Sequence, residues 1–393
     1  MTTFHHSSLD LLQKIPKELQ KIDHIEFTHP TLVQKIVSIV ERQDFVPKTI
    51  LEPGCGSGEF LYVLQETFPQ SDIVGIDKNK CIIDTIRNNF SSNVTVEHKN
   101  FFSIHRKFDL IIGWVPFYLL NKYDISRNQQ AFIEGRPNSS ILYLLQACDL
   151  LEQNGIIAFI LPVSFLSSLA HNTIRDIIYN HYQIITIFDV RNKSQKNDIV
   201  FIIQKKIPMT NDLFTCKLKN CMVFNEPEKT KLMQSLITGE TIHNLLLDVR
   251  IGTIPWNTHK DCLTNDSSKT QLIYSSNVKG KSIVRVANKN PEKKQYIDKE
   301  GMSEPVIVVN RGYGKGKFHL EFCLVDQEKP FLVENHLMYI YSHQIISREE
   351  KLKRLYLIQK SLEDSRTTTF IRLYFGNSAM NSSELKYILP VYI

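Results

Sequence analysis

The chain has 393 residues, more than one typical domain and enough to bury a core in each of two. Its composition, 42% hydrophobic and 22% charged, is that of an ordinary soluble globular protein, and a net charge of +6 permits a polyanionic partner without indicating one. The seven cysteines are never spaced as C-x-x-C, which argues against a disulfide framework and against a metal site. With no signal-peptide pattern and no apolar run long enough to span a bilayer, we expect a cytoplasmic protein.

Short apolar runs alternate with helical patterns from residue 49 to about residue 206. An amphipathic stretch at 31–41 precedes them and predicts a helix packed on the sheet. The expected strands cover residues 49–51, 73–76, 94–96, 110–112, 156–161, 184–188 and 199–203. The expected helices between them cover residues 59–67, 80–88, 140–151 and 173–180. Such alternation predicts an α/β fold, a parallel sheet with helices on both faces.

The repeating strand–helix pattern stops at about residue 208. Beyond it, turn residues and clustered lysines and arginines become more frequent. We therefore predict two domains, of residues 1–208 and 209–393, with the boundary region at about 208–245 and with mixed α+β structure in the second domain.

A glycine-rich loop stands directly after the first expected strand, in residues 50–60 (ILEPGCGSGEF). Gly54, Gly56 and Gly58 let the backbone turn tightly and approach a ligand, and the following helix offers free N–H groups. The carboxylate of Glu52 suits the cationic methionyl end of S-adenosyl-L-methionine and would repel a dinucleotide pyrophosphate, whose usual pattern is G-x-G-x-x-G. We predict S-adenosyl-L-methionine as the cofactor. The loop residues expected to contact it are Glu52, Pro53, Gly54, Cys55 and Gly56.

An acid ends the second expected strand. Asp77 stands 19 residues after Gly58, where a carboxylate can accept both hydroxyl groups of a ribose. The alternative is an aspartate that only caps the turn between strand and helix. The spacing favours the ribose.

These motifs resemble class I methyltransferases, and more narrowly the gamma-class N6-adenine DNA methyltransferases of type II restriction–modification systems. The resemblance implies a Rossmann-like catalytic domain and a C-terminal target-recognition domain. Residues 27–30 (FTHP) are similar to the family's F-x-T-P element, which implies that Thr28 lies over the cofactor's methionine. Residues 99–102 (KNFF) are similar to the segment that grips the adenine, which implies that Asn100 accepts from its amine and that Phe101 packs on its ring.

The similarity covers most of the chain. It continues in residues 108–118, 139–166 and 197–206, and in residues 249–263, 271–277 and 373–390 of the second domain. It implies a sequence-specific enzyme that transfers a methyl group to the N6 amine of an adenine flipped out of duplex DNA, the modification arm of a restriction–modification system.

The family's catalytic motif, N-P-P-Y/F, corresponds here to Trp114, Val115, Pro116 and Phe117. In the family, the first side chain and a prolyl carbonyl accept from the target amine, and the final aromatic stacks on the base. Pro116 and Phe117 match, whereas the indole of Trp114 can only donate and Val115 removes one proline. Either the enzyme works through backbone carbonyls, with Trp114 as a stacking surface or a core aromatic, or it is an impaired homologue that binds DNA and cofactor without efficient transfer.

The second aromatic that would sandwich the base is missing from its usual loop, residues 189–197. Phe188 or Phe201 could serve, although both suit a core better.

Two stretches of the second domain are candidates for DNA contact. Residues 279–294 hold six basic residues and one acid, with Lys281 and Arg285 as expected phosphate contacts, although a solvated face is an equally good interpretation. Residues 306–317 (VIVVNRGYGKGK) run from a strand into a glycine-rich turn, for which a plain surface hairpin is the alternative. The DNA-contact candidates there are Arg311, Tyr313, Lys315 and Lys317.

The expected partner is double-stranded DNA. No convincing nuclease motif is present, so restriction would belong to a separate cognate endonuclease, and we expect a monomer that does not bind membranes. A methyltransferase acting on RNA or on protein amides is a further alternative, against which the resemblance of the second domain speaks.

Overall fold

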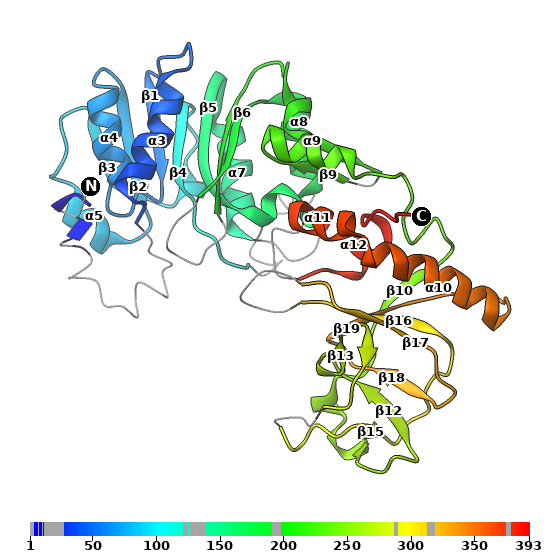
Figure 1. Cartoon of the computed structure of the whole chain (residues 1–393). Helices are drawn as coiled ribbons and strands as arrows, with labels where there is room; N and C mark the ends of the chain where they lie inside the picture. Colours follow the sequence, from blue (N-terminus) through cyan, green and yellow to red (C-terminus); the bar gives the residue numbers. More distant parts are fainter. Residues whose placement is uncertain are drawn as a thin grey trace. The chain divides into compact units, whose positions relative to one another are not determined.

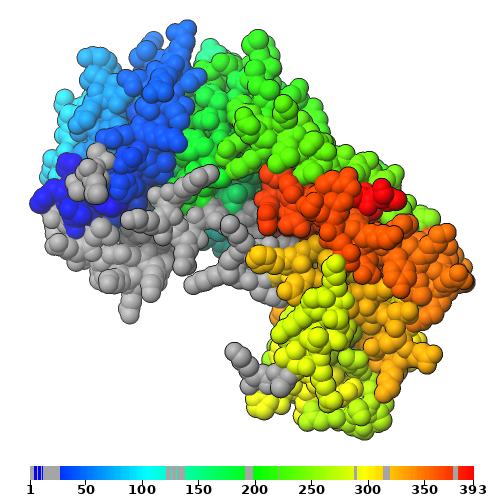
Figure 2. Space-filling model, viewed as in Figure 1, coloured from blue at the N-terminus to red at the C-terminus, as the bar shows by residue number. Residues whose placement is uncertain are grey.

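The computed structural model describes residues 4–6, 8, 9, 11, 27–120, 125, 130, 138–190, 198–219, 221–286, 290–312, 319–374 and 379–393. Its contacts divide the chain into two compact units, one of residues 1–216 with 222–230 and one of residues 217–221 with 231–393. Figure 2 shows them in space-filling form, the first in blue to green and the second from yellow-green to red.

The first unit is built on a seven-stranded sheet with the order β3-β2-β1-β4-β5-β7-β6 (Figure 1). Its strands are β1 (Thr49–Pro53), β2 (Asp72–Asp77), β3 (Val94–His98), β4 (Phe108–Trp114), β5 (Leu151–Pro162), β6 (Gln183–Asp189) and β7 (Asp198–Gln204). Five neighbouring strands pair in parallel, and β7 runs antiparallel between β5 and β6. The predicted α/β sheet is confirmed, with β7 as the departure from a purely parallel arrangement. Only residues 190–197 separate β6 from β7, too few for the crossover that a parallel pair needs.

Helices cover both faces of this sheet, because side chains on a strand alternate between faces. Leu110 and Ile112 of β4 point to one face of the sheet and pack with the helices that come before β4 in the chain. Ile111 points to the other face and packs with the helices that come after β4. The first group is α3 (Pro30–Glu41), α4 (Glu59–Thr67) and α5 (Lys80–Ile86). The second group is α7 (Ser139–Leu150) and α8 (Asn172–His181).

The predicted elements of this unit are all present, with shifted ends. The largest shift is in β5, which begins at Leu151, five residues before the predicted strand. Residues 152–154, near its start, are exposed and polar, so no alternation of apolar and polar residues marks this part of the strand.

Arg175 of α8 is fully buried and ties three stretches of backbone together. Its guanidinium donates to the carbonyl oxygens of Met222 at 2.6 Å, Phe165 at 2.8 Å and Ser168 at 2.8 Å. The forked geometry of arginine permits three such bonds from one side chain. The segment after β7 is thereby joined to the core of the first unit.

The chain passes from one unit to the other through β8 (Thr215–Leu218), β9 (Cys221–Phe224) and α9 (Pro227–Ser235), which contain residues of both units. The second unit contains two four-stranded sheets, with the orders β10-β19-β16-β17 and β11-β15-β12-β18, and the hairpin β13-β14. Its larger core lies under the first of these sheets and is rich in β-branched residues.

The strands of the second unit are β10 (Asp248–Ile251), β11 (Leu263–Thr264), β12 (Thr270–Ile273), β13 (Val278–Lys279), β14 (Ser282–Ile283), β15 (Tyr296–Ile297), β16 (Val306–Asn310), β17 (Phe322–Val325), β18 (Phe331–Val333) and β19 (Leu337–Tyr341). Its helices are α10 (Arg348–Glu363), α11 (Ser365–Tyr374) and α12 (Ser382–Tyr387). Within the described residues, no helix has the length and apolar character needed to cross a membrane.

Replacing Arg175 by lysine should destabilise the first unit. A single ammonium cannot reach all three carbonyls, so we expect Arg175→Lys to lower the free energy of unfolding by about 2–4 kcal/mol in urea titrations followed by circular dichroism. Arg87→Lys on α5 is the control, because that guanidinium is half exposed and makes one loose ion pair at 3.9 Å. A change of less than about 0.5 kcal/mol is expected there, and equal losses in both variants would contradict the role of Arg175.

Candidate functional site

The glycine-rich loop joins β1 to α4 and is fixed to the end of β2. Gly54, Gly56 and Gly58 have φ angles of 74°, 50° and 81°, a region in which side chains are strained. The backbone N–H groups of Gly54 and Cys55 both donate to the carbonyl oxygen of Ile76, at 2.8 and 2.9 Å. The loop therefore lies beside the carboxyl end of the neighbouring strand, where α/β sheets bind ligands.

Two of these glycines meet different surroundings. A Cβ on Gly58 would lie 2.6 Å from the ring of Phe90, so this glycine allows close packing. A Cβ on Gly54 would have no atom within 4 Å. Gly54 instead leaves open space for a ligand, because it lines a cavity together with Gly56.

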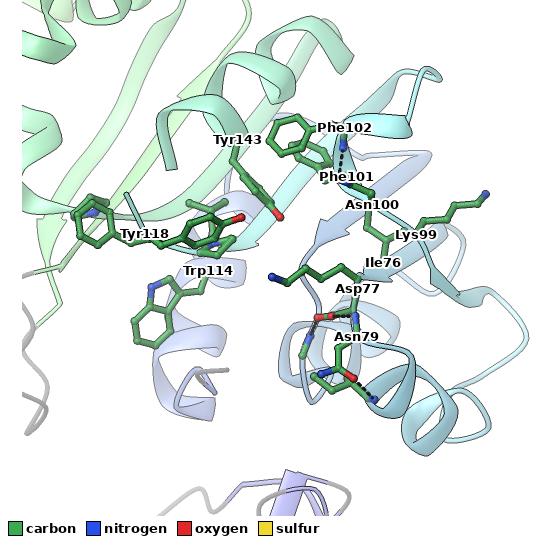
Figure 3. A pocket seen from close by; sticks show the side chains of 18 of the residues that line it. Ile76, Asp77, Asn79, Lys99, Asn100, Phe101, Phe102, Trp114, Tyr118 and Tyr143 are labelled. Atoms are coloured by element: carbon green, nitrogen blue, oxygen red, sulfur yellow. Dashed lines mark hydrogen bonds between the residues drawn. The ribbon is translucent and has the colours of Figure 1, made fainter. Parts of the chain in front are cut away.

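This cavity, of about 390 Å³, lies within the first unit (Figure 3). Its wall runs from the glycine loop and Asp77 to the short 3₁₀ helix η1 (Phe101–Ser103) and the segment that follows β4. Its volume is in the range of pockets that hold cofactors and other small ligands.

Asp77 caps the turn after β2 and also lines the cavity. Its carboxylate accepts from the N–H groups of Gly56 at 3.1 Å and of Asn79 at 2.8 Å, so it does brace the turn. Each carboxylate oxygen has two acceptor positions, and Asp77 also lines the cavity. The capping bonds therefore leave it able to accept from a ligand.

Glu52 is buried beside the loop in an environment short of positive charge. It is 3% exposed, and its Oε2 has no hydrogen-bond partner among the described residues. Burial raises the pKa of Glu52 well above its usual value, and the nearby carboxylates of Asp77 and Glu59 raise it further. A cation bound here would relieve both the missing hydrogen bond and the repulsion between the acids.

Thr28 lies close to this carboxylate. Thr28, Glu52, Cys55 and Trp114 line a much smaller space, of about 20 Å³, beside the loop. The carboxylate and the threonine are therefore in the neighbourhood that the F-x-T-P resemblance implies. Burial raises the pKa of the Cys55 thiol, so it stays neutral.

Aromatic rings form the opposite wall of the large cavity. The buried ring of Phe101 stacks on Tyr143 of α7 with centroids 4.9 Å apart, and Phe102 meets Tyr143 edge to face at 5.3 Å. The side-chain oxygen of Asn100 accepts from the N–H of Phe102 at 3.0 Å and so caps η1. Phe101 and Asn100 both line the cavity, as a site for an adenine ring requires.

The segment after β4 closes the cavity. Trp114, Pro116 and Phe117 all line it, and the ring of Phe117 is 47% exposed. Figure 3 shows the indole of Trp114 pointing away from the hydroxyl of Tyr143, and it packs at the edge of the core on the α3 and α4 side. The carbonyl oxygen of Pro116 accepts from the hydroxyl of Ser139 at 2.6 Å.

Residues 46–231 match a family model described as a methyltransferase domain. The chain is 25% identical to "Type II methyltransferase M.CvrRI" of Paramecium bursaria Chlorella virus XZ-6E in an alignment that is 403 positions long, gaps included, and covers 100% of both chains. It is 24% identical over 389 residues, 96% of both chains, to "Modification methylase CviBIII" of Paramecium bursaria Chlorella virus NC1A. The solved structure of the type IIG restriction endonuclease BpuSI matches 94% of this chain and 58% of its own at 11% identity, with a TM-score of 0.45.

Residues 46–231 are a methyltransferase domain. We assign S-adenosylmethionine as its cofactor because the residues that line the cavity and the small space beside the glycine loop fit that molecule. The unpartnered carboxylate oxygen of Glu52 suits its ammonium group, the open space at Gly54 admits it to the loop, and the aromatic wall suits its adenine.

Most of the predicted cofactor residues lie around this cavity in the methyltransferase domain. Gly54, Gly56, Asp77, Asn100 and Phe101 line it. Thr28, Glu52 and Cys55 line only the smaller space beside the glycine loop. Pro53, a buried residue that ends β1, lines neither space.

Several cavity residues escaped the sequence analysis. Lys78 and Asn79 follow Asp77 directly, and the ammonium of Lys78 lies 5.6 Å from the centre of the Tyr118 ring. Figure 3 shows the hydroxyls of Tyr118 and Tyr143 pointing toward one another. The position of Tyr118 after the catalytic motif could have identified it, whereas nothing in the sequence singles out Tyr143.

Neither candidate for the second aromatic lies free in the structure. Phe201 is fully buried in the core of the methyltransferase domain. The ring of Phe188 is covered by the ammonium of Lys35 at 3.9 Å. Residues 191–197, in the loop between β6 and β7 where the second aromatic was expected, lie outside the described residues.

The predicted DNA-contact residues belong to the second unit. Arg285 is exposed and has no partner among the described residues, whereas Lys281 pairs with Glu363 at 3.1 Å. Arg311 donates to the carbonyl oxygen of Asn335 at 3.1 Å. Tyr313, Lys315 and Lys317 lie outside the residues that the structure describes.

Neutralising Glu52 should affect folding and cofactor binding in opposite directions. Glu52→Gln removes a buried charge from a group of acids, so we expect the cofactor-free protein to be stabilised by about 1 kcal/mol or more at pH 8. The same change should weaken S-adenosylmethionine binding about 10-fold or more in calorimetry, because the counter-charge of the ammonium is lost. Glu66→Gln, an exposed position on the same helix as Glu59, should change neither quantity.

The free energy of unfolding should also depend on pH through Glu52. The folded domain holds the Glu52 proton more tightly than the unfolded chain, so that proton contributes stability that is lost as pH rises from the ordinary value of 4.5 through the raised one. Glu52→Gln should flatten this fall. A variant whose stability still falls as steeply with pH would contradict the assignment.

Proposed function

We propose that this chain is a sequence-specific DNA methyltransferase that transfers a methyl group from S-adenosylmethionine to the N6 amine of a flipped-out adenine, as the modification arm of a restriction–modification system. The observation that carries the proposal is the cofactor cavity with residues 114–118 on its wall. Alignment over the whole chain with a type II methyltransferase and a modification methylase supports it. The choice of adenine N6 rests on the resemblance of residues 108–118 and 139–166 to the gamma class.

In this proposal the cavity and the small space beside the glycine loop each hold a part of the cofactor. Glu52 and Thr28, which line the small space, bind the methionyl end, and the Asp77 carboxylate, which lines the cavity, accepts from the ribose hydroxyls. Asn100 and Phe101 hold the adenine, with Tyr143 supporting the ring of Phe101 from behind. When bound, the cofactor supplies an electrophilic methyl group on a sulfonium.

The protein's part in transfer is to hold the amine in line with that methyl group. The half-exposed ring of Phe117 offers a stacking surface for a base taken out of the duplex. In this proposal the acceptor for the amine is the carbonyl oxygen of Val115, to which no described residue donates, whereas one of the two lone pairs of the Pro116 carbonyl is taken by Ser139. A backbone carbonyl can accept one amine hydrogen and keep electron density on the nitrogen.

Trp114 leaves this site one acceptor short. Its indole nitrogen can only donate, and its ring packs toward the core on the α3 side. Loss of one hydrogen bond to a reacting group can slow a reaction by about 10²-fold. The same observation favours a second candidate function, a homologue that binds DNA and cofactor with little methyl transfer.

An isotope-transfer assay tests both candidates. Purified protein is incubated with tritiated S-adenosylmethionine and mixed-sequence duplex DNA, and the digested nucleosides are identified. Label in N6-methyladenine supports the proposed enzyme, and cofactor binding without label supports the impaired homologue. Label in another nucleoside, or label in RNA or protein but not in DNA, would refute the proposal.

Restoring a side-chain acceptor should raise the rate. We expect Trp114→Asn to increase the single-turnover rate of adenine methylation by about 10-fold or more, because the amide oxygen can accept from the amine. Trp114→Leu, which removes the indole without adding an acceptor, is the matched control. Equal rates in the two variants would show that the missing acceptor does not limit transfer.

The second unit is proposed as the target-recognition domain. Arg285→Ala should weaken DNA binding about equally for all sequences and reduce the slope of log K against log salt by about 1, as expected for one phosphate contact. Lys269→Ala in the same unit is the control, because that ammonium is held by Asp298 at 2.7 Å. The comparison is made by fluorescence anisotropy at several salt concentrations, and an unchanged slope in Arg285→Ala would remove this residue from the DNA surface.

A further inference from the structure

Ser139, the first residue of α7, makes three hydrogen bonds to the segment that follows β4. Its hydroxyl donates to the carbonyl oxygen of Pro116 at 2.6 Å and accepts from the N–H of Tyr118 at 2.9 Å. Its own N–H donates to the carbonyl oxygen of Tyr118 at 3.0 Å. Because Ser139 is 1% exposed, water cannot replace these bonds.

Asn138 fixes the position of Ser139 from the other side. Its side-chain oxygen accepts from the N–H of Ile141 at 3.2 Å and from the hydroxyl of Ser140 at 2.6 Å, which caps α7. Its amide nitrogen therefore faces Nε2 of His171 as a donor, at 3.1 Å. This contact requires a neutral imidazole with its proton on Nδ1.

His171 is itself held in the core of the first unit. It is 5% exposed, and burial lowers the pKa of His171 to about 4, with a further contribution from the charge of Arg175. Two of the three carbonyl bonds of Arg175 fix Phe165 and Ser168 in the stretch that leads to His171, whose N–H donates to the carbonyl oxygen of Ser168 at 3.0 Å. Hydrogen bonds thus run from Arg175 through Ser168 and His171 to Asn138, and the next residue in the chain, Ser139, binds the carbonyl of Pro116.

The segment held in this way has lost a backbone constraint. The resembling motif has two consecutive prolines, and this chain has Val115 in place of the first, which frees its φ angle. Val115 also carries the carbonyl that the proposed function assigns to the target amine. Displacements of about 1 Å in such a group can lower a rate by about 10²-fold.

We propose that Ser139 is a positioning residue for methyl transfer in this protein. Its hydrogen bonds to Pro116 and Tyr118 supply the rigidity that the additional proline gives in the resembling motif. Asn138 and His171 hold Ser139 in register. This inference rests on the proposed function, because it concerns the carbonyl of Val115 as the acceptor.

The test compares two buried serines. Ser139→Ala removes the two hydroxyl bonds to the segment and keeps the backbone bond to Tyr118, and Ser139→Cys weakens the two hydroxyl bonds while preserving the side chain's shape. Ser71→Ala is the matched control, because the Ser71 hydroxyl is 3% exposed and donates to the carbonyl of Pro47, also at 2.6 Å, at the opposite end of β2. All three variants lose one buried hydroxyl bond to a prolyl carbonyl.

We expect both Ser139 variants to lower the kcat for adenine methylation at least 10-fold while the Kd for S-adenosylmethionine changes less than about 2-fold. Ser71→Ala should keep its kcat within about 2-fold of the unmodified protein. A purely structural role would instead lower the thermal midpoint of all three variants equally and leave kcat unchanged. Unchanged or faster transfer in Ser139→Ala overturns the proposal, since Ser139 would then merely occupy an acceptor.

A second measurement does not depend on methylation. The chain has two tryptophans, so Trp256→Phe leaves Trp114 as the only one and its fluorescence reports on this segment. In that background Ser139→Ala should at least double the acrylamide quenching constant of Trp114, whereas Ser71→Ala should leave it unchanged. Increased quenching without adenine methylation in any variant would refute the proposed function and retain the rigid segment; equal quenching in both would refute the positioning role.

Discussion

The N–H groups of Gly54 and Cys55 share one acceptor, the carbonyl oxygen of Ile76, and this shared contact determines the layout of the site. It fixes the loop after β1 to the end of β2, and so brings the carboxylates of Glu52 and Asp77 into one neighbourhood. Their repulsion and the burial of Glu52 are unfavourable in the free domain. A cation bound between loop and strand offsets that cost, which is why a methyl donor with a positive charge suits this loop.

Most of the first unit could be predicted because its information is local. The two faces of β4 and β5 follow from the alternation of side chains along a strand. The loop is recognisable in the sequence from three glycines, which adopt positive φ angles in the structure. The reversal of β7 and the early start of β5 could not be predicted from apolar runs, since neither changes the periodicity of side chains.

The cofactor side of the site was largely predictable, and the transfer side was not. Asp77 and Asn100 stand at fixed distances from recognisable strands, whereas Tyr143 reaches Phe101 from a helix that begins 38 residues later in the chain. Such a contact depends on tertiary packing alone. The same holds for Ser139, an unremarkable serine in sequence, whose hydroxyl meets Pro116 only because α7 packs beneath that segment.

Arg175 bears on where the second unit could be exchanged between relatives. The seven-stranded sheet is complete at Gln204, but one of the three carbonyls around Arg175 belongs to Met222 in β9, 18 residues later. A fusion that replaced everything after the sheet would leave a buried guanidinium without one of its acceptors. Recombination between relatives should therefore succeed when the crossover falls after residue 230, where the first compact unit ends.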